Sequence, residues 1–128
     1  MSTRPIVRKK ILIADDDPSV AECLDILLGL CGYEVLVAFD GQEAVKQARR
    51  VVPDLILLDM VMPKLNGFDA CKIIKQDPAL RHIPVIALTS LSQMGDIEKA
   101  FTAGADDYQH KPFDNAHLME KVEKFLKG

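Results

Sequence analysis

The sequence predicts an α/β fold, a three-layer αβα sandwich built on a five-stranded parallel sheet. Short apolar runs alternate with segments of helical periodicity five times along the 128 residues, which is typical of successive βα units. The run at residues 54–59 is the most continuously apolar, so it is expected near the centre of the sheet, covered on both faces. Four runs also end in polar side chains at the same relative place, which would bring these groups to one edge of the sheet.

The expected strands are the apolar runs that lie between turn signals. The fifth is assigned from its place in the alternation, because its composition is a poor match to a strand. The strands are expected at residues 11–14, 33–39, 54–59, 84–88 and 106–110.

Five helices are expected after these strands. Pro18 is suited to open the first, with Asp17 or Ser19 as its cap, and Gly32 and Gly104 are suited to end the first and the fourth. The side chains expected to face the core are Val20, Leu24, Leu27 and Cys31; Ala44, Val45 and Ala48; Phe68, Cys71 and Ile74; Ile97, Ala100 and Phe101; and Leu118, Val122, Phe125 and Leu126.

The length fits one domain, expected over residues 10–128 after a short basic arm at residues 1–9. A formal net charge of −3 argues against a chain that binds nucleic acid through its overall charge. The three cysteines lie in apolar helical patterns, so buried free thiols in a reducing compartment are expected. The sequence has no signal-peptide pattern and no apolar stretch that could span a bilayer, so a cytoplasmic location without membrane contact is expected.

The polar groups at the strand ends form a candidate site. They are Asp15, Asp16, Asp59, Thr89 and Lys111. A carboxylate at the end of the most buried strand needs a positive partner, which Lys111 or a divalent cation would supply. Oxygen ligands favour Mg²⁺, and His110, beside Lys111, should point away from the site, so zinc is not expected. Asp59 is then a plausible nucleophile toward a phosphoryl group. The metal and Lys111 would neutralise the phosphoryl oxygens, and the Thr89 hydroxyl would donate a hydrogen bond to one of them.

Several motifs occur in a fixed order along the chain. They are Asp15-Asp16 after an apolar strand, Asp59 followed by Met-Val-Met-Pro, Asn66-Gly67, Thr89-Ser90, Gly104-Ala105-Asp106-Asp107-Tyr108, and Lys111-Pro112-Phe113. Each motif alone is weak, but the ordered set is specific. Over essentially its whole length the chain resembles the receiver domain of bacterial response regulators, the CheY-like family.

The resemblance implies a flavodoxin-like sheet of strand order 2-1-3-4-5 and a phosphorylation-dependent switch of a two-component system. Asp59 would accept a phosphoryl group from a sensor histidine kinase or a histidine phosphotransfer protein. Asp16 and Asp59 would ligate Mg²⁺ directly, Asp15 would act mainly through a metal-bound water, and Val61 would contribute its backbone carbonyl. The domain would catalyse only its own phosphorylation and its own slow dephosphorylation.

The resemblance also assigns the parts that respond to phosphorylation. Lys111 and Thr89 would contact the phosphoryl group, the Lys111–Pro112 bond would be cis, and Tyr108 would be the aromatic switch that turns inward as Thr89 moves. The fourth helix, fifth strand and fifth helix would form the surface read by a downstream protein effector, without direct DNA binding by this domain. The candidates for partner contact are Met94, Tyr108, His110 and Lys121. A stand-alone or adaptor role is expected.

Two further expectations concern neighbouring residues. Val61 and Leu91, two positions after Asp59 and Thr89, are apolar and cannot orient a hydrolytic water, so the phosphorylated form should decay slowly. Asp106 and Asp107 begin the fifth strand instead of ending one, so they are expected in a solvated loop.

Two other classes of protein remain as alternatives. A phosphohydrolase of the haloacid-dehalogenase kind would use an Asp-x-Asp after the first strand, a spacing that Asp15 and Asp17 satisfy, but its cap insertion and later acidic pair are missing. A flavin or nucleotide binder would need a phosphate-cradling loop after the first strand, where the acidic triplet would instead repel phosphate.

Overall fold

The computed structural model describes residues 8–90, 94–112 and 114–127, with Met94 described by its backbone alone. These residues form five strands, which are β1 (Lys10–Ala14), β2 (Glu34–Ala38), β3 (Leu55–Asp59), β4 (Val85–Thr89) and β5 (Asp107–His110). They also form five helices, which are α1 (Pro18–Leu30), α2 (Gly41–Val51), α3 (Gly67–Gln76), α4 (Met94–Thr102) and α5 (Asn115–Leu126). The predicted alternation is therefore confirmed, with boundaries that differ by one residue or so at most strand ends.

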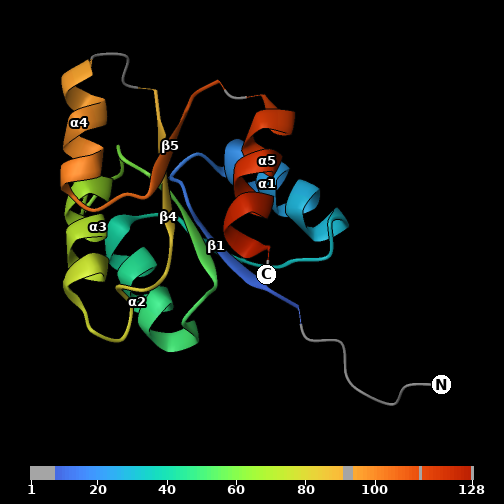
Figure 1. Ribbon diagram of the computed structural model, residues 1–128, viewed down its shortest axis with the longest axis horizontal. Helices are drawn as coiled ribbons and strands as arrows, with labels where there is room; N and C mark the ends of the chain where they lie inside the picture. The colour runs from blue at the N-terminus through green and yellow to red at the C-terminus, as the bar shows by residue number, and fades with distance from the viewer. Residues whose placement is uncertain (1–7, 91–93, 113, 128) are drawn as a thin grey trace.

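The strands form one parallel sheet in the order β2-β1-β3-β4-β5. Helices α1 and α5 cover one face of the sheet, and α2, α3 and α4 cover the other (Figure 1). This is the predicted three-layer sandwich with β3 at its centre. Among the described residues, no helix has the length and apolar character needed to cross a membrane.

Strand β3 explains why the sequence shows one unbroken apolar run there. Leu55 and Leu57 point into the core shared with α1 and α5, whereas Ile56 and Leu58 point into the core shared with α2, α3 and α4. All four side chains have 0% exposure. Successive residues of a strand face opposite sides, so only a strand covered on both sides buries every position.

The first helix begins as expected but buries a slightly different face. Asp17 caps it by accepting a hydrogen bond from the Ser19 backbone N–H at 2.9 Å, and Pro18 follows at the first helical position. Leu24 and Leu28 are fully buried, whereas Cys23 and Cys31 are exposed. The expectation of three buried thiols is therefore wrong, and only Cys71 lies in the core.

Helix α4 also differs from its predicted orientation. Ala100 is buried, but Phe101 is 45% exposed and packs edge-on against Tyr108, with ring centroids 6.0 Å apart. The prediction of an inward Phe101 is wrong because Ala100 and Ala103, three residues apart on one side of the chain, fill the core positions and leave Phe101 beside them.

The expectation of a solvated loop is met only in part, because Asp106 is exposed before β5 but its carboxylate has fixed partners. The Asp106 carboxylate lies 2.7 Å from Lys75 Nζ and accepts a hydrogen bond from the Val85 N–H at 2.8 Å. Lys75 Nζ also donates to the Ile83 carbonyl at 2.7 Å. Asp107 is the first residue of β5. Asp106 thus ties α3 to the starts of β4 and β5, an arrangement set by long-range contacts that local sequence does not reveal.

Candidate functional site

The predicted polar groups come together because four neighbouring parallel strands end at the same edge of the sheet. Asp59 and Thr89 are the last residues of β3 and β4, and Asp15 and Lys111 directly follow β1 and β5. Asp15, Asp59 and Thr89 are the polar side chains buried in the described part of the chain, at 0%, 5% and 3% exposure. This edge of the sheet therefore concentrates the buried polar groups of the fold.

Lys111 holds the two buried carboxylates together. Its Nζ lies 2.6 Å from Asp15 Oδ2 and 3.3 Å from Asp59 Oδ2. Burial alone would lower the pKa of this ammonium group, but the hydrogen bond to Asp15 and the charge of Asp59 outweigh it, so the pKa lies above its usual value. Lys111 is therefore a fixed positive charge within this cluster of acids.

The surroundings of Asp59 disfavour an anion. Burial raises its pKa to about 6, and the charge of Asp15 adds to this effect. The N–H of Val61, 3.1 Å from Asp59 Oδ1, and the Lys111 ammonium oppose the rise. Asp59 is thus mostly ionised at neutral pH but poorly solvated, so it gains much from added positive charge.

Three carboxylates form a candidate metal centre. Asp15, Asp16 and Asp59 each offer an oxygen, and these atoms lie within 4.8 Å of one another. An oxygen-only donor set suits Mg²⁺ or another hard cation and does not suit zinc. Asp16 is exposed, whereas both oxygens of Asp15 already accept hydrogen bonds, from the Asp17 N–H at 2.9 Å and from Lys111. The residues present therefore fit a magnesium ion.

Gly67 allows the chain after Asp59 to fold back onto the site. Its N–H donates to the Met60 carbonyl at 3.1 Å. A Cβ at this position would lie 2.1 Å from the Asp59 carbonyl oxygen and 2.5 Å from Met60 Cα. The sequence suggested Asn66-Gly67 only as a loop signal, and its closeness to the Asp59 backbone emerges from the structure.

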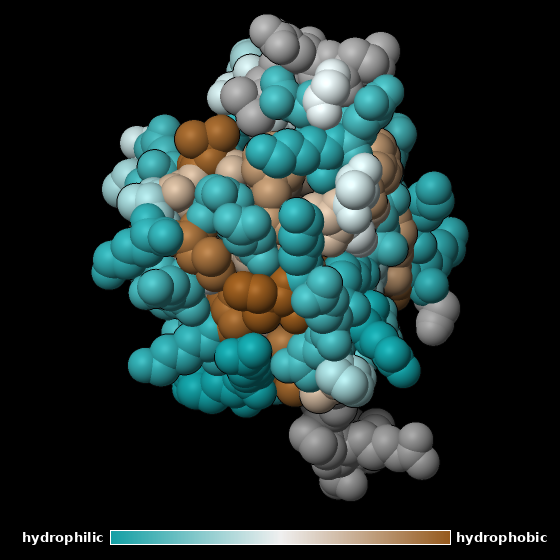
Figure 2. Space-filling model, turned by 90° about the vertical axis from the view of Figure 1, so that its left-hand side faces the viewer, coloured by the Kyte–Doolittle hydropathy of each residue, from teal (hydrophilic) through white to brown (hydrophobic). Residues whose placement is uncertain are grey.

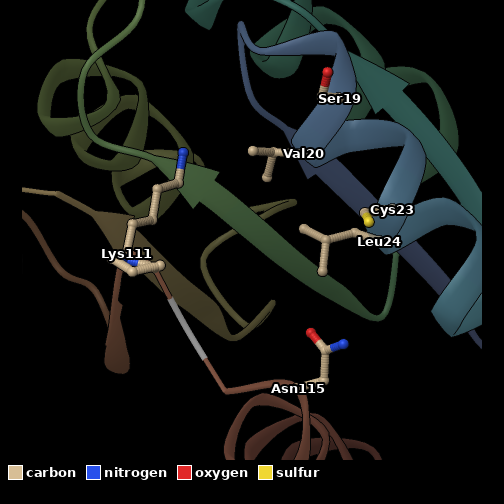
Figure 3. A pocket seen from close by; sticks show the side chains of 7 residues that line it. Ser19, Val20, Cys23, Leu24, Lys111 and Asn115 are labelled. Carbon is tan, nitrogen blue, oxygen red and sulfur yellow. The ribbon is translucent and has the colours of Figure 1, made fainter.

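A groove of about 440 Å³ opens beside Lys111, between α1 and the start of α5 (Figure 3). Its lining is mainly apolar, and the Lys111 side chain extends past it toward the carboxyl end of β3 (Figure 3). The lining residues are Ser19, Val20, Cys23, Leu24, Lys111, Pro112 and Asn115. Sequence reasoning missed the groove, because helical periodicity does not reveal how far α5 covers α1.

The residues expected at the partner surface are only partly brought together. Lys121 Nζ donates to the Tyr108 carbonyl, lies 5.3 Å from the Tyr108 ring centroid and 3.6 Å from Asp107 Oδ1. Tyr108 is half-buried and His110 is exposed. The side chain of Met94, and all of Leu91, lie outside the described residues. The Lys111–Pro112 bond is cis, as the resemblance implies.

Comparisons with known proteins agree with this geometry. Residues 11–123 match the family described as the response regulator receiver domain. The chain is 41% identical over 118 residues to the DNA-binding dual master transcriptional regulator RpaA of Synechocystis, covering 92% of this chain and 49% of RpaA. It is 39% identical over 118 residues to the response regulator PleD of Caulobacter vibrioides, covering 92% of this chain and 26% of PleD. The chain thus spans about half the length of RpaA and less of PleD.

Solved structures give the same result. A response regulator from Chloroflexus aurantiacus has 35% identity and a TM-score of 0.90, with 95% of this chain and 100% of that chain covered. The receiver domain of the sensor histidine kinase PA1611 from Pseudomonas aeruginosa, solved with a magnesium ion in its active site cleft, has 34% identity and a TM-score of 0.88 over 95% of this chain and 100% of that chain. The family match and the shared fold together show that the chain belongs to the response regulator receiver domains of two-component signalling systems.

Proposed function

We propose that Asp59 is the phosphoacceptor of this receiver domain and that its modification switches the surface of α4, β5 and α5. The observation that carries the proposal is the buried Asp59 carboxylate, 3.3 Å from Lys111 Nζ and within the three-carboxylate cluster. A nucleophile, a fixed ammonium group and a set of metal ligands are the parts that phosphoryl transfer requires.

Asp59 attacks the phosphorus of a phosphohistidine on a sensor kinase or phosphotransfer protein. An O–P bond forms to the carboxylate while the donor's P–N bond breaks, and its electron pair leaves with the imidazole. Magnesium, when held by Asp16, Asp59 and the Val61 carbonyl, supplies positive charge to the phosphoryl oxygens. Asp15 is occupied by Lys111 and the Asp17 N–H, which supports an indirect role for Asp15 through water.

Lys111 and Thr89 then respond to the added charge. A phosphoryl group brings roughly −1.5 to −2 charges into a cluster of carboxylates, so the Lys111 ammonium moves its pairing from Asp15 and Asp59 toward the new oxygens. Thr89 lies at the end of β4 in register with His110 of β5, so its movement is passed directly to the strand that carries Tyr108. A difference of a few kcal/mol between two conformations suffices to change which one dominates.

The surface that a partner would recognise lies at the β5 edge of the sheet, around Tyr108. Tyr108 packs against Phe101 of α4 and under Lys121 of α5, so a turn of its ring changes the surface of all three elements. His110 and Met94 complete the proposed contact surface for a protein effector. This surface uses protein contacts and no direct DNA contact, whatever further domains the longer relatives carry.

The proposal is tested by incubating the full chain with Mg²⁺ and a small acyl phosphate and measuring intact mass. We expect one phosphoryl adduct that is absent in Asp59→Ala and retained in Asp17→Ala, since Asp17 caps α1 and stands outside the acidic cluster. Continuous release of phosphate that depends on Asp15 would indicate a haloacid-dehalogenase type of hydrolase instead.

The lifetime of the adduct depends on the residue two positions after Asp59. The Val61 side chain is 52% exposed at the mouth of the site and has no group that can orient water. Val61→Asn should speed loss of the adduct several-fold, whereas Val61→Ile should leave it unchanged, both followed by mass after removal of the donor. Equal decay of all three proteins would refute a slow switch set by this position.

A further inference from the structure

A second groove lies between α2 and α3, on the opposite side of the sheet from α1 and α5. It has a volume of about 460 Å³. Its floor is apolar and its rim is polar, and the lining residues are Gln42, Val45, Lys46, Arg49, Leu65 and Ile73. Figure 2 shows this side of the molecule, where apolar surface lies exposed among hydrophilic side chains. Leu65 and Ile73 line the groove and are half-buried, so part of each side chain is accessible from it.

The charge around this groove is opposite to that of the whole chain. Of the six residues that line it, Lys46 and Arg49 are basic and none is acidic, although the chain has a formal net charge of −3. The Arg49 side chain is 58% exposed and meets Asp77 only at 3.4 Å. Lys46 has no ion-pair partner within 4.0 Å among the residues described. The rim therefore presents two exposed positive charges, of which Arg49 pairs with Asp77 and Lys46 is left for a partner.

We propose that the α2–α3 groove binds an amphipathic helix of a partner protein, with apolar side chains on one face and acidic side chains beside them. Apolar residues at helical spacing would enter between Val45, Leu65 and Ile73, while glutamate or aspartate side chains pair with Lys46 and Arg49. Helix-in-groove recognition uses this combination, an apolar floor that takes the apolar face of the helix and charged groups beside it.

The apolar floor of the groove favours a protein helix over nucleic acid as the partner. A nucleic-acid backbone would use the basic rim but leave Ile73 and Leu65 without a function, because phosphates bind to charged and hydrogen-bonding groups. An acidic amphipathic helix uses both features. The inference does not rest on phosphorylation of Asp59, since the groove lies outside the strand-end cluster.

The test uses three synthetic helical peptides of about 15 residues, the length below which isolated helices are only marginally stable. The first places leucines on one face with flanking glutamates, the second has the same composition with the leucines distributed around the helix, and the third replaces glutamate by lysine. We expect only the first to bind the full chain, measured by calorimetry, with amide shift changes in α2 and α3.

Matched variants locate the binding. Arg49→Glu and Lys46→Glu should each weaken the first peptide about tenfold, whereas Lys124→Glu, which changes net charge equally on the exposed side of α5, should not. Ile73→Gln should weaken binding without removing the charge, and the exposed Arg49 remains informative if that variant unfolds. Equal binding of the second or third peptide, an equal effect of Lys124→Glu, or displacement by double-stranded DNA would overturn the proposal.

Discussion

Asp59 illustrates how a functional group can reduce the stability of the protein that carries it. Its pKa is raised to about 6 from 3.8, first by burial, so the folded protein holds this proton more tightly than the unfolded chain does. Stability therefore falls as the pH rises from about 4 to about 6, and the loss persists above that range. One pKa unit corresponds to about 1.4 kcal/mol, which sets an upper limit of about 3 kcal/mol.

We expect Asp59→Asn to raise the free energy of unfolding at pH 8, without magnesium, by about 1–3 kcal/mol. The gain should shrink when the same urea titration is run at pH 4.5, where wild-type Asp59 is protonated when folded. Asp25→Asn, at an exposed position of α1, serves as the control and should change little. A less stable Asp59→Asn protein at pH 8 would show that the Lys111 pairing outweighs burial.

The three thiols should differ in reactivity. Burial raises the pKa of Cys71 to about 11, so this thiol is protonated at pH 8 and shielded from reagents, while Cys23 and Cys31 are exposed. A disulfide reagent should therefore modify two thiols quickly in the native protein and the third only in denaturant. Rapid modification of three thiols would mean that the α3 core opens readily.

At the residue scale, the sequence predicted which side chains form the site better than it predicted which side chains are buried. Asp15, Asp59, Thr89 and Lys111 could be found because the end of a parallel strand fixes where a side chain lies. The exposure of Cys23 could not, because it depends on how far a helix from a distant part of the chain extends over α1.

At the element scale, two glycines make a matched pair for testing the junction after β3. A Cβ on Gly67 would meet backbone atoms at 2.1 Å and 2.5 Å, whereas a Cβ on Gly29 in α1 meets nothing within 4 Å. Gly67→Ala should lower the free energy of unfolding by at least about 3 kcal/mol, and Gly29→Ala should raise it by up to about 1 kcal/mol.

Thermal and urea unfolding of both glycine variants measure this difference. A well-folded Gly67→Ala protein with wild-type stability would mean that the α3 start can move away from Asp59, and the proposed rigidity of the site would then be wrong.

Lys75 should stabilise the end of the sheet opposite the acidic cluster. Its ammonium binds Asp106 and the Ile83 carbonyl, each at 2.7 Å, and its side chain is 16% exposed. Lys75→Met keeps the stem and leaves Asp106 and that carbonyl without this donor, so a loss of about 1–3 kcal/mol is expected in urea unfolding. Lys72→Met, exposed on the same helix, should stay within about 0.5 kcal/mol of wild type. Equal stability of both variants would contradict this stabilising role of Lys75.

The elements themselves were predictable because their periodicity changes from helix to strand at each turn signal. The face that each helix turns toward the sheet was harder to predict. Helix α1 buries Leu28 in place of Cys31, and α4 leaves Phe101 exposed. Amphipathic patterns with apolar residues on several faces permit more than one orientation, and contacts with the sheet decide between them.

At the scale of the whole molecule, cation binding should stabilise the entire fold, because two of the carboxylates follow β1 and the third ends β3, so they are close together only when the protein is folded. Ligand present at 100 times its Kd adds about 2.7 kcal/mol to the free energy of unfolding. Calorimetry at rising Mg²⁺ should show an increasing Tm. Asp16→Asn should reduce that increase, while Asp17→Asn, which keeps a helix cap, should not.

A Tm that does not respond to Mg²⁺, or that responds equally in both variants, would exclude the acidic cluster as the binding site.

The sandwich could be predicted as a whole because alternating βα units leave few ways to build a parallel sheet. The grooves at its sides could not, since they arise where neighbouring helices do not meet.

The missing side chain of Gly67 has a consequence for how this chain tolerates change. A survey of every single substitution should find this position as intolerant as Asp59, although it carries no reactive group, because every other amino acid brings a Cβ into the Asp59 and Met60 backbone. Losses at Asp59 should remove signalling while leaving protein abundance intact, whereas losses at Gly67 should remove both together.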